Sequence, residues 1–189
     1  MSPRRAFAIG IVVAGMVLAT YPGSALADVG SSQHHRVPDA AIRFVGAESV
    51  LGTYRDPGAW VGGHVRNGTA VHQTIKEQLA GAAPKGSHYL YELKIRTPGA
   101  ARQFGVKVGG PGSWTVSYFV GESDITAALV AGTYETPVVA RGATFKITIR
   151  ARLGQPGTSI TRLFRVSPVA HPRRIDAVRL RIDYSRCGC

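Results

Sequence analysis

Apolar and polar residues alternate with a period of two along three long stretches of the chain, residues 88–96, 143–152 and 175–184. In the second stretch every other residue is apolar, namely Phe145, Ile147, Ile149 and Ala151. Successive side chains of a β-strand point to opposite faces of its sheet, so this period is typical of a strand with one buried and one solvated face. We therefore expect Phe145 and Ile147 to lie in a hydrophobic core.

Shorter stretches add further candidate strands, at residues 42–45, 71–79, 103–108, 114–120 and 160–166. The second of these also fits a helical turn, and we favour a strand because its neighbours are strands. Residues 124–130 look like one helical turn capped by Asp124, too short to be stable alone. Gly and Pro separate the stretches, and no long amphipathic helix occurs. The pattern predicts an all-β, antiparallel β-sandwich of seven to nine strands, with a closed barrel as the alternative that periodicity leaves open.

The N-terminal residues have the three regions of a secretory signal peptide. Arg4 and Arg5 precede an apolar run at 6–20, and the small residues of Ala25-Leu26-Ala27 follow. The run has 15 residues, fewer than the roughly 20 of a membrane-spanning helix, and the arginine pair also fits a twin-arginine signal. We expect a signal peptide at 1–27, a flexible leader at 28–38, one β-sandwich domain at 39–184 and a tail at 185–189. The processed protein is then expected to be a monomer without a membrane span, secreted or held at the cell surface.

Residues 39–184 resemble a single copy of the immunoglobulin-like modules of secreted and cell-surface bacterial proteins, which include cell-adhesion-related domains and the NEW3-type domains attached to glycoside hydrolases. The residues that carry the resemblance are 89–96, 104–108, 114–119, 124–126, 131–136, 140–142 and 176–178. Arg141 and Thr97-Pro98-Gly99 stand where such modules usually have Pro-Gly and an Asn-Asp-Gly turn. The resemblance implies an immunoglobulin- or fibronectin-like sandwich that is extracellular and non-catalytic.

The chain is strongly basic, with a net charge of +12, or +10 once the two arginines of the predicted signal peptide are removed. The alternation places the following basic side chains on the solvated faces of their strands: Lys146, Arg150, Arg152, Arg179 and Arg181. If both strands belong to one sheet, these side chains form a cationic surface able to bind an anionic cell-wall polymer or acidic polysaccharide. The alternative is a face that is only solvated, since arginine is the chain's preferred basic residue. Nucleic acid is the weaker choice of ligand, because no aromatic side chains are interleaved with the arginines.

The sequence contains no set of residues that indicates catalysis. Its six histidines are scattered, and none has a second ligand at a metal-binding spacing. We therefore expect a non-enzymatic binding or structural module without metal or cofactor. Trp60, in a glycine-rich loop, is the candidate for stacking on sugars if the protein is instead an accessory carbohydrate-binding protein, whereas Trp114 alternates with apolar residues and is expected in the core. Cys187 and Cys189 are the only cysteines, and we expect a disulfide within this tail rather than between chains.

Overall fold

A computed structural model of the chain describes residues 37–49, 52–55, 57–63, 68–79, 84 and 86–185, except for the side chains of 53–55. The predicted signal peptide, most of the leader, and Cys187 and Cys189 lie outside the described residues, so the expectations for them stay predictions. The described elements are β1 (Asp39–Ser49), β2 (Gly52–Arg55), β3 (Val61–Gly62), β4 (Thr74–Leu79), β5 (His88–Arg96), β6 (Phe104–Gly109), β7 (Val116–Val120), β8 (Ser123–Asp124), α1 (Thr126–Ala131), β9 (Tyr134–Glu135), β10 (Thr144–Arg152), β11 (Thr158–Pro168) and β12 (Asp176–Tyr184). In this part of the chain no helix is long and apolar enough to cross a bilayer.

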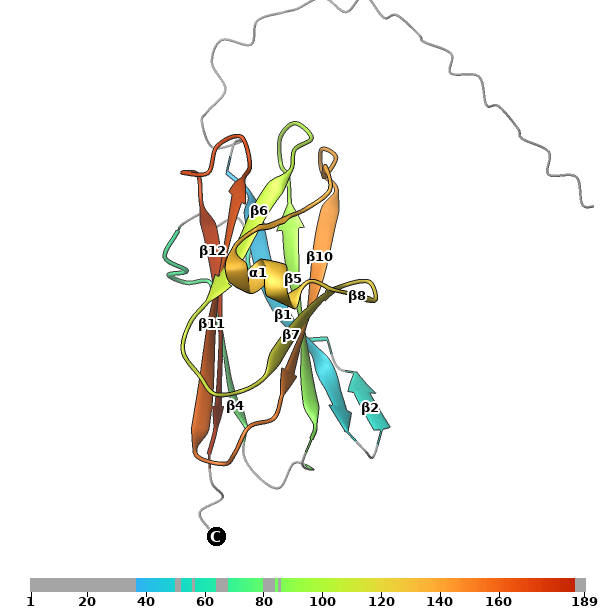
Figure 1. Cartoon of the computed structure of the whole chain (residues 1–189), viewed down its shortest axis with the longest axis vertical. Helices are drawn as coiled ribbons and strands as arrows, with labels where there is room; N and C mark the ends of the chain where they lie inside the picture. Colours follow the sequence, from blue (N-terminus) through green and yellow to red (C-terminus); the bar gives the residue numbers. More distant parts are fainter. Residues whose placement is uncertain are drawn as a thin grey trace, which may run out of the picture. The chain divides into compact units, whose positions relative to one another are not determined.

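The strands form two sheets that pack against each other as a sandwich (Figure 1). Sheet A has the order β2–β1–β5–β10–β7–β8, with β3 also paired to β1, and sheet B has the order β4–β12–β11–β6–β9. The fold is the predicted immunoglobulin-like β-sandwich. One pair departs from the antiparallel expectation, because β4 runs parallel to β12.

The three stretches with the clearest alternation become strands of nine residues, β5, β10 and β12, whereas the shorter candidate stretches 42–45 and 160–166 extend into the eleven-residue strands β1 and β11. β5 spans the predicted residues 88–96, and β12 begins one residue after the predicted start. The ambiguous stretch 71–79 is a strand as favoured, but it starts only at Thr74, because residues 70–73 form a turn in which the N–H of Gln73 donates to the carbonyl of Ala70 at 3.1 Å. Val71 lies in this turn and is 54% exposed.

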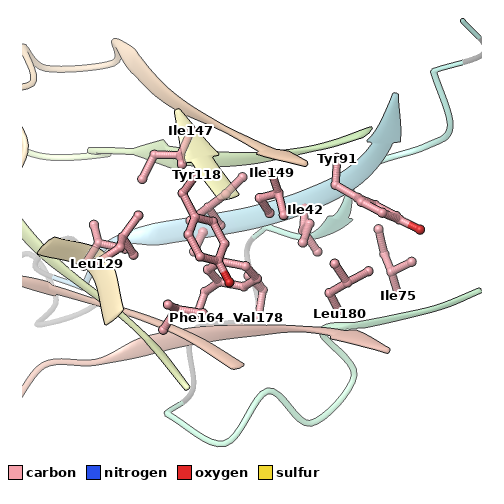
Figure 2. Packing of buried hydrophobic residues seen from close by; sticks show 14 of the residues in the cluster. Ile42, Ile75, Tyr91, Tyr118, Leu129, Ile147, Ile149, Phe164, Val178 and Leu180 are labelled. Carbon is pink, nitrogen blue, oxygen red and sulfur yellow. The ribbon is translucent and has the colours of Figure 1, made fainter. Parts of the chain in front are cut away.

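The hydrophobic core lies between the two sheets. Figure 2 shows side chains of sheet A (Ile42, Tyr118, Ile147 and Ile149) facing those of sheet B (Phe164, Val178 and Leu180). The rings of Tyr118 and Phe164 meet edge to face with their centroids 5.8 Å apart, a favoured aromatic geometry. Ile147 is fully buried as expected, whereas Phe145, close to the start of β10, is only half-buried against this core.

Trp114 is buried in the core, as its alternation predicts. Only 4% of it is exposed, and its indole N–H donates to Thr158 Oγ1 at 2.8 Å. Gly154 packs directly on the ring: a Cβ at that position would lie 2.2 Å from Nε1 of the indole. Trp114 therefore fits only because residue 154 has no side chain.

Helix α1 confirms the predicted helical turn but begins differently. Ile125 is its N-cap and makes no side-chain capping bond, while Asp124, the predicted cap, accepts the N–H of Thr126 through Oδ1 at 2.8 Å. α1 lies across the side of the sandwich between β6 and β7 (Figure 1). Its Leu129 is fully buried and fills that side of the core (Figure 2).

A buried carboxylate joins the starts of three strands. Asp176, at the first residue of β12, is fully buried. Its Oδ2 accepts the N–H of Ala40 in β1 at 2.7 Å, and its Oδ1 accepts from Nε2 of Gln73, next to β4, at 3.0 Å. These bonds offset the cost of burying the charge and tie sheet A to sheet B.

Candidate functional site

The basic residues singled out in the sequence lie on two opposite faces of the sandwich. Strand β10, with Lys146 and Arg150, belongs to sheet A, and β12, with Arg179 and Arg181, belongs to sheet B. In each strand the intervening apolar residues are buried between the sheets, so the basic side chains point outward on opposite sides. The expected single cationic surface is therefore not formed, because its strands are in different sheets.

On the outer face of sheet A, three basic side chains are paired with carboxylates. Lys146 Nζ lies 3.6 Å from Oε1 of Glu92, whose Oε2 also pairs with Arg43 at 2.6 Å. Arg150 pairs with Glu48. This face therefore offers less net positive charge to a ligand than its lysine and arginine content suggests.

Arg152 lies apart from these pairs, exposed at the end of β10. It lines an open cleft of about 600 Å³ together with Trp114 and Tyr184. Its strand neighbour on β5 is His88. Burial, and then the positive charge of Arg150, lower the pKa of the His88 imidazole below its usual range, so this histidine carries less positive charge at neutral pH than a solvated one.

Trp60 packs against two cations of its own chain. The guanidinium carbon of Arg43 lies 4.6 Å from the centre of the indole ring, and Nζ of Lys94 lies 4.2 Å from it. Both are cation–π distances, and Trp60 is half-buried. The ring is thus engaged within the protein, and this arrangement lends no support to a role for Trp60 in stacking on sugars.

A basic groove crosses the outer face of sheet B. Arg179 and Arg181 of β12 line it together with Lys76 of β4 and His72 of the preceding turn, and its volume is about 780 Å³. The strand register brings these residues together, since Arg181 lies opposite Lys76 and Arg179 lies opposite Thr74. Two of the predicted basic residues therefore share a site with two that the sequence did not single out.

The turn before β4 builds one wall of the groove. Ala70 and His72 have positive φ angles of 58° and 61°, a conformation that costs energy for residues with a side chain. The hydroxyl of Thr74 donates to the carbonyl of Ala70 at 3.3 Å, and Nη2 of Arg179 donates to the carbonyl of Thr69 at 3.2 Å. These bonds hold the turn beside Arg179 and place His72 at the rim.

The opposite wall is Gly110 and Pro111, held by an arginine from inside the sandwich. Arg162 occupies an inward position of β11, opposite the buried Leu180, and its Nη1 donates to the carbonyls of Gly110 and Pro111, each at 3.0 Å. The N–H of Thr161 also donates to Pro111, at 2.9 Å. Gly110 has φ 128°, and a Cβ there would lie 2.4 Å from the carbonyl oxygen of Thr161, so only glycine permits this close approach.

The groove is electropositive along its lining. None of the residues that line it is acidic. The neighbouring acid is Asp183, whose Oδ2 accepts from Nε of Arg181 at 2.8 Å. Both side chains of this pair are well exposed, so the pair is screened by water and holds Arg181 only weakly. Lys76, for its part, makes no ion pair within the described residues.

The groove offers positive charge and hydrogen-bonding groups to a ligand. Thr74 and Thr161 add hydroxyl groups to its cationic lining. Among the residues that the structure describes, no three His, Cys, Asp or Glu side chains are placed to hold a metal ion. The lining is thus complementary to negative charge.

Comparison with known proteins gives no family for the chain and only distant structural likenesses. No protein-family profile and no curated protein sequence matches the chain. Among solved structures, the ASH/PapD-like domain 7 of human CEP192 aligns with a TM-score of 0.41 and 9% identity over 89% of this chain and 99% of that one.

Two further structures give a similar result. The N-terminal domain of PorA aligns with a TM-score of 0.40 and 12% identity over 77% of this chain and 96% of that one. The secreted serine protease VesC from Vibrio cholerae aligns with a TM-score of 0.33 and 13% identity over 57% of this chain and 21% of that one. Likenesses this distant carry no argument about function. The strands of the chain and their pairing show that it is an all-β, immunoglobulin-like sandwich.

Proposed function

We propose that the protein is an exported, non-catalytic binding module that contacts anionic polymers of the cell envelope or the extracellular medium through the basic groove of sheet B. One observation carries the proposal: Lys76, Arg179, Arg181 and His72 line a single groove that contains no acidic residue. Export is supported by the signal-peptide pattern of residues 1–27.

The ligand is expected to be held mainly by charge. Arginine and lysine at an open surface attract polyanions over distances of about one Debye length, roughly 10 Å at 0.1 M salt. The proposal therefore predicts binding at low ionic strength that weakens steeply as salt is raised, and almost no binding at 1 M, where this distance is about 3 Å.

Two charge-matched double variants test the site. Lys76→Gln/Arg179→Gln removes two positive charges from the groove, and Lys146→Gln/Arg150→Gln removes two from the outer face of sheet A, where each is paired with a glutamate. Binding to immobilised long-chain polyphosphate is measured by biolayer interferometry across a salt series. We expect the groove variant to bind at least tenfold more weakly, a loss of about 1.4 kcal/mol, and the sheet A variant to stay within about twofold of wild type.

The two variants also define the results that reject the proposal. Equal losses in both would mean that only net charge matters. Absence of binding by the wild-type protein at low salt would remove the function altogether.

A further inference from the structure

The positive charge of sheet B continues beyond the groove in the direction of β6. Arg165 of β11 lies opposite Lys107 of β6, and it also lies opposite Ala177 of β12, two residues from Arg179. Both Arg165 and Lys107 are exposed on the outer face. Together with Lys76, Arg179 and Arg181 they form what we call the basic band, which runs diagonally over four adjacent strands.

The strand register sets the length of the basic band. Lys76 and Arg181 are at one level of the sheet, Arg179 is two residues along, and Arg165 and Lys107 are two residues further. With a rise of about 3.3 Å per residue and strands about 4.8 Å apart, successive levels are about 7 Å apart and the band is about 20 Å long. A single phosphate or carboxylate occupies only a fraction of that length.

Carboxylates mark both ends of the band and do not interrupt it. Asp183 lies on β12 two residues beyond Arg181, and Glu135 of β9 lies opposite Gly105, two residues beyond Lys107. Within the described residues, no acidic side chain of this face therefore lies between two of the five cations. A ligand that follows the band crosses no carboxylate between its first and last cations, and Asp183, which pairs with Arg181, lies at the edge of the band.

The band also lacks the groups that read bases or sugar rings. The aromatic residues of these four strands, Phe104, Phe164 and Tyr184, are buried on the inner side of the sheet. Recognition of nucleobases or sugar faces depends on exposed aromatic platforms. The contacts available here are with the charged backbone of a ligand, and three of the five cations are arginines, whose planar forks pair well with phosphate oxygens.

We propose that the basic band binds a flexible linear phosphate polymer along its whole length of about 20 Å, so that the protein discriminates by polymer length as well as by charge. This inference rests on the proposed function, because the basic groove is one end of the band. It extends the proposed binding site by two residues, Arg165 and Lys107. It also specifies a ligand with a phosphate backbone.

The test measures affinity against inorganic polyphosphates of defined length, from triphosphate to long chains, with ligand concentration expressed per phosphate. The proteins are wild type, the band variant Lys107→Gln/Arg165→Gln, the groove variant Lys76→Gln/Arg179→Gln and the control Lys146→Gln/Arg150→Gln. Circular dichroism and thermal melting verify that each is folded, which matters most for Arg179→Gln because Arg179 is half-buried and bonds to the carbonyl of Thr69.

The two pairs of substitutions should respond differently to ligand length. We expect wild-type affinity to rise until the polymer spans the band and then to level off. The band variant should lose about tenfold for long chains and nothing for triphosphate, and the dependence of its affinity on salt should be shallower by about 2 in log–log slope. The groove variant should lose affinity for both ligands, and the control for neither.

Each alternative result identifies which statement fails. If the band variant binds long chains as well as wild type does, the extended band is wrong and the groove remains. If a carboxylate polymer or single-stranded DNA of equal charge binds as tightly as polyphosphate, the phosphate assignment is wrong. If wild type binds none of these polyanions at low salt, the proposed function itself fails.

Discussion

Replacing Gly154 with alanine would place a methyl group where the indole of Trp114 already lies. The new Cβ would be 2.2 Å from Nε1 and 2.4 Å from Cδ1 of the ring, well inside van der Waals contact, so the ring or the loop that carries residue 154 must move. Overpacking of this kind costs about 1–3 kcal/mol. Movement of the ring also breaks its bond to Thr158 Oγ1 and leaves a buried N–H unpaired, which adds about 1–3 kcal/mol.

The reduced freedom of alanine in the unfolded chain offsets about 1 kcal/mol of this cost, so we expect Gly154→Ala to lower the free energy of unfolding by about 1–5 kcal/mol. Urea titration followed by fluorescence measures this in a Trp60→Phe background, where Trp114 is the remaining tryptophan. Gly109→Ala is the control, because a Cβ there meets nothing within 4 Å. Adding Trp114→Phe to Gly154→Ala, with unfolding of these variants followed by far-UV circular dichroism because no tryptophan then remains, should cost less than the sum of the two single changes, since Phe has no atom at Nε1. A loss below about 0.5 kcal/mol for Gly154→Ala, the usual range of a neutral substitution, would show that the close packing of ring and glycine is not as described.

Two further predictions concern the core. Ile147→Ala should cost about 2–5 kcal/mol because the side chain is fully buried, whereas Phe145→Ala, at a half-buried position, should cost only about 1–2 kcal/mol; equal losses in denaturant titration would contradict this difference in depth. Burial raises the pKa of Tyr118 from 10.0 to about 12, so the folded protein holds this phenolic proton more tightly than the unfolded chain does. Stability should accordingly be independent of this group below about pH 10 and fall as pH rises toward 12, and Tyr118→Phe should flatten that fall in melts recorded across this range.

Alternation along the sequence was a reliable guide to strands because it depends only on neighbouring side chains. β5 and β12 could be predicted almost to the residue, and so could the inward direction of Ile147 and Trp114. Alternation of apolar and polar residues does not predict a charged residue that faces inward. Arg162 shares its face of β11 with buried residues, and it is tolerated there because backbone carbonyls accept its hydrogen bonds.

The candidate site was only partly predictable, because a surface depends on which strands are neighbours. Arg179 and Arg181 were expected at the site, but their partner Lys76 is more than a hundred residues away in the chain and joins them only through the pairing of β4 with β12. No glycine or proline marks the turn at Ala70 and His72, whose positive φ angles are imposed by the fold. Lys146 and Arg150 were expected in the same surface, and sheet assignment alone separates them from it.

The position of Asp176 has a consequence for the order of folding. β12 is the C-terminal strand of the sandwich, yet it lies inside sheet B with β4 on one side and β11 on the other. Its first residue supplies the carboxylate that holds Ala40 and Gln73, 136 and 103 residues earlier. Contacts between such distant residues require the closure of long loops, which slows the search for the native state. Among the early strands, β4 therefore has no partner in sheet B until β12 is available, and a nascent chain should not complete the sandwich until almost all of it has been synthesised.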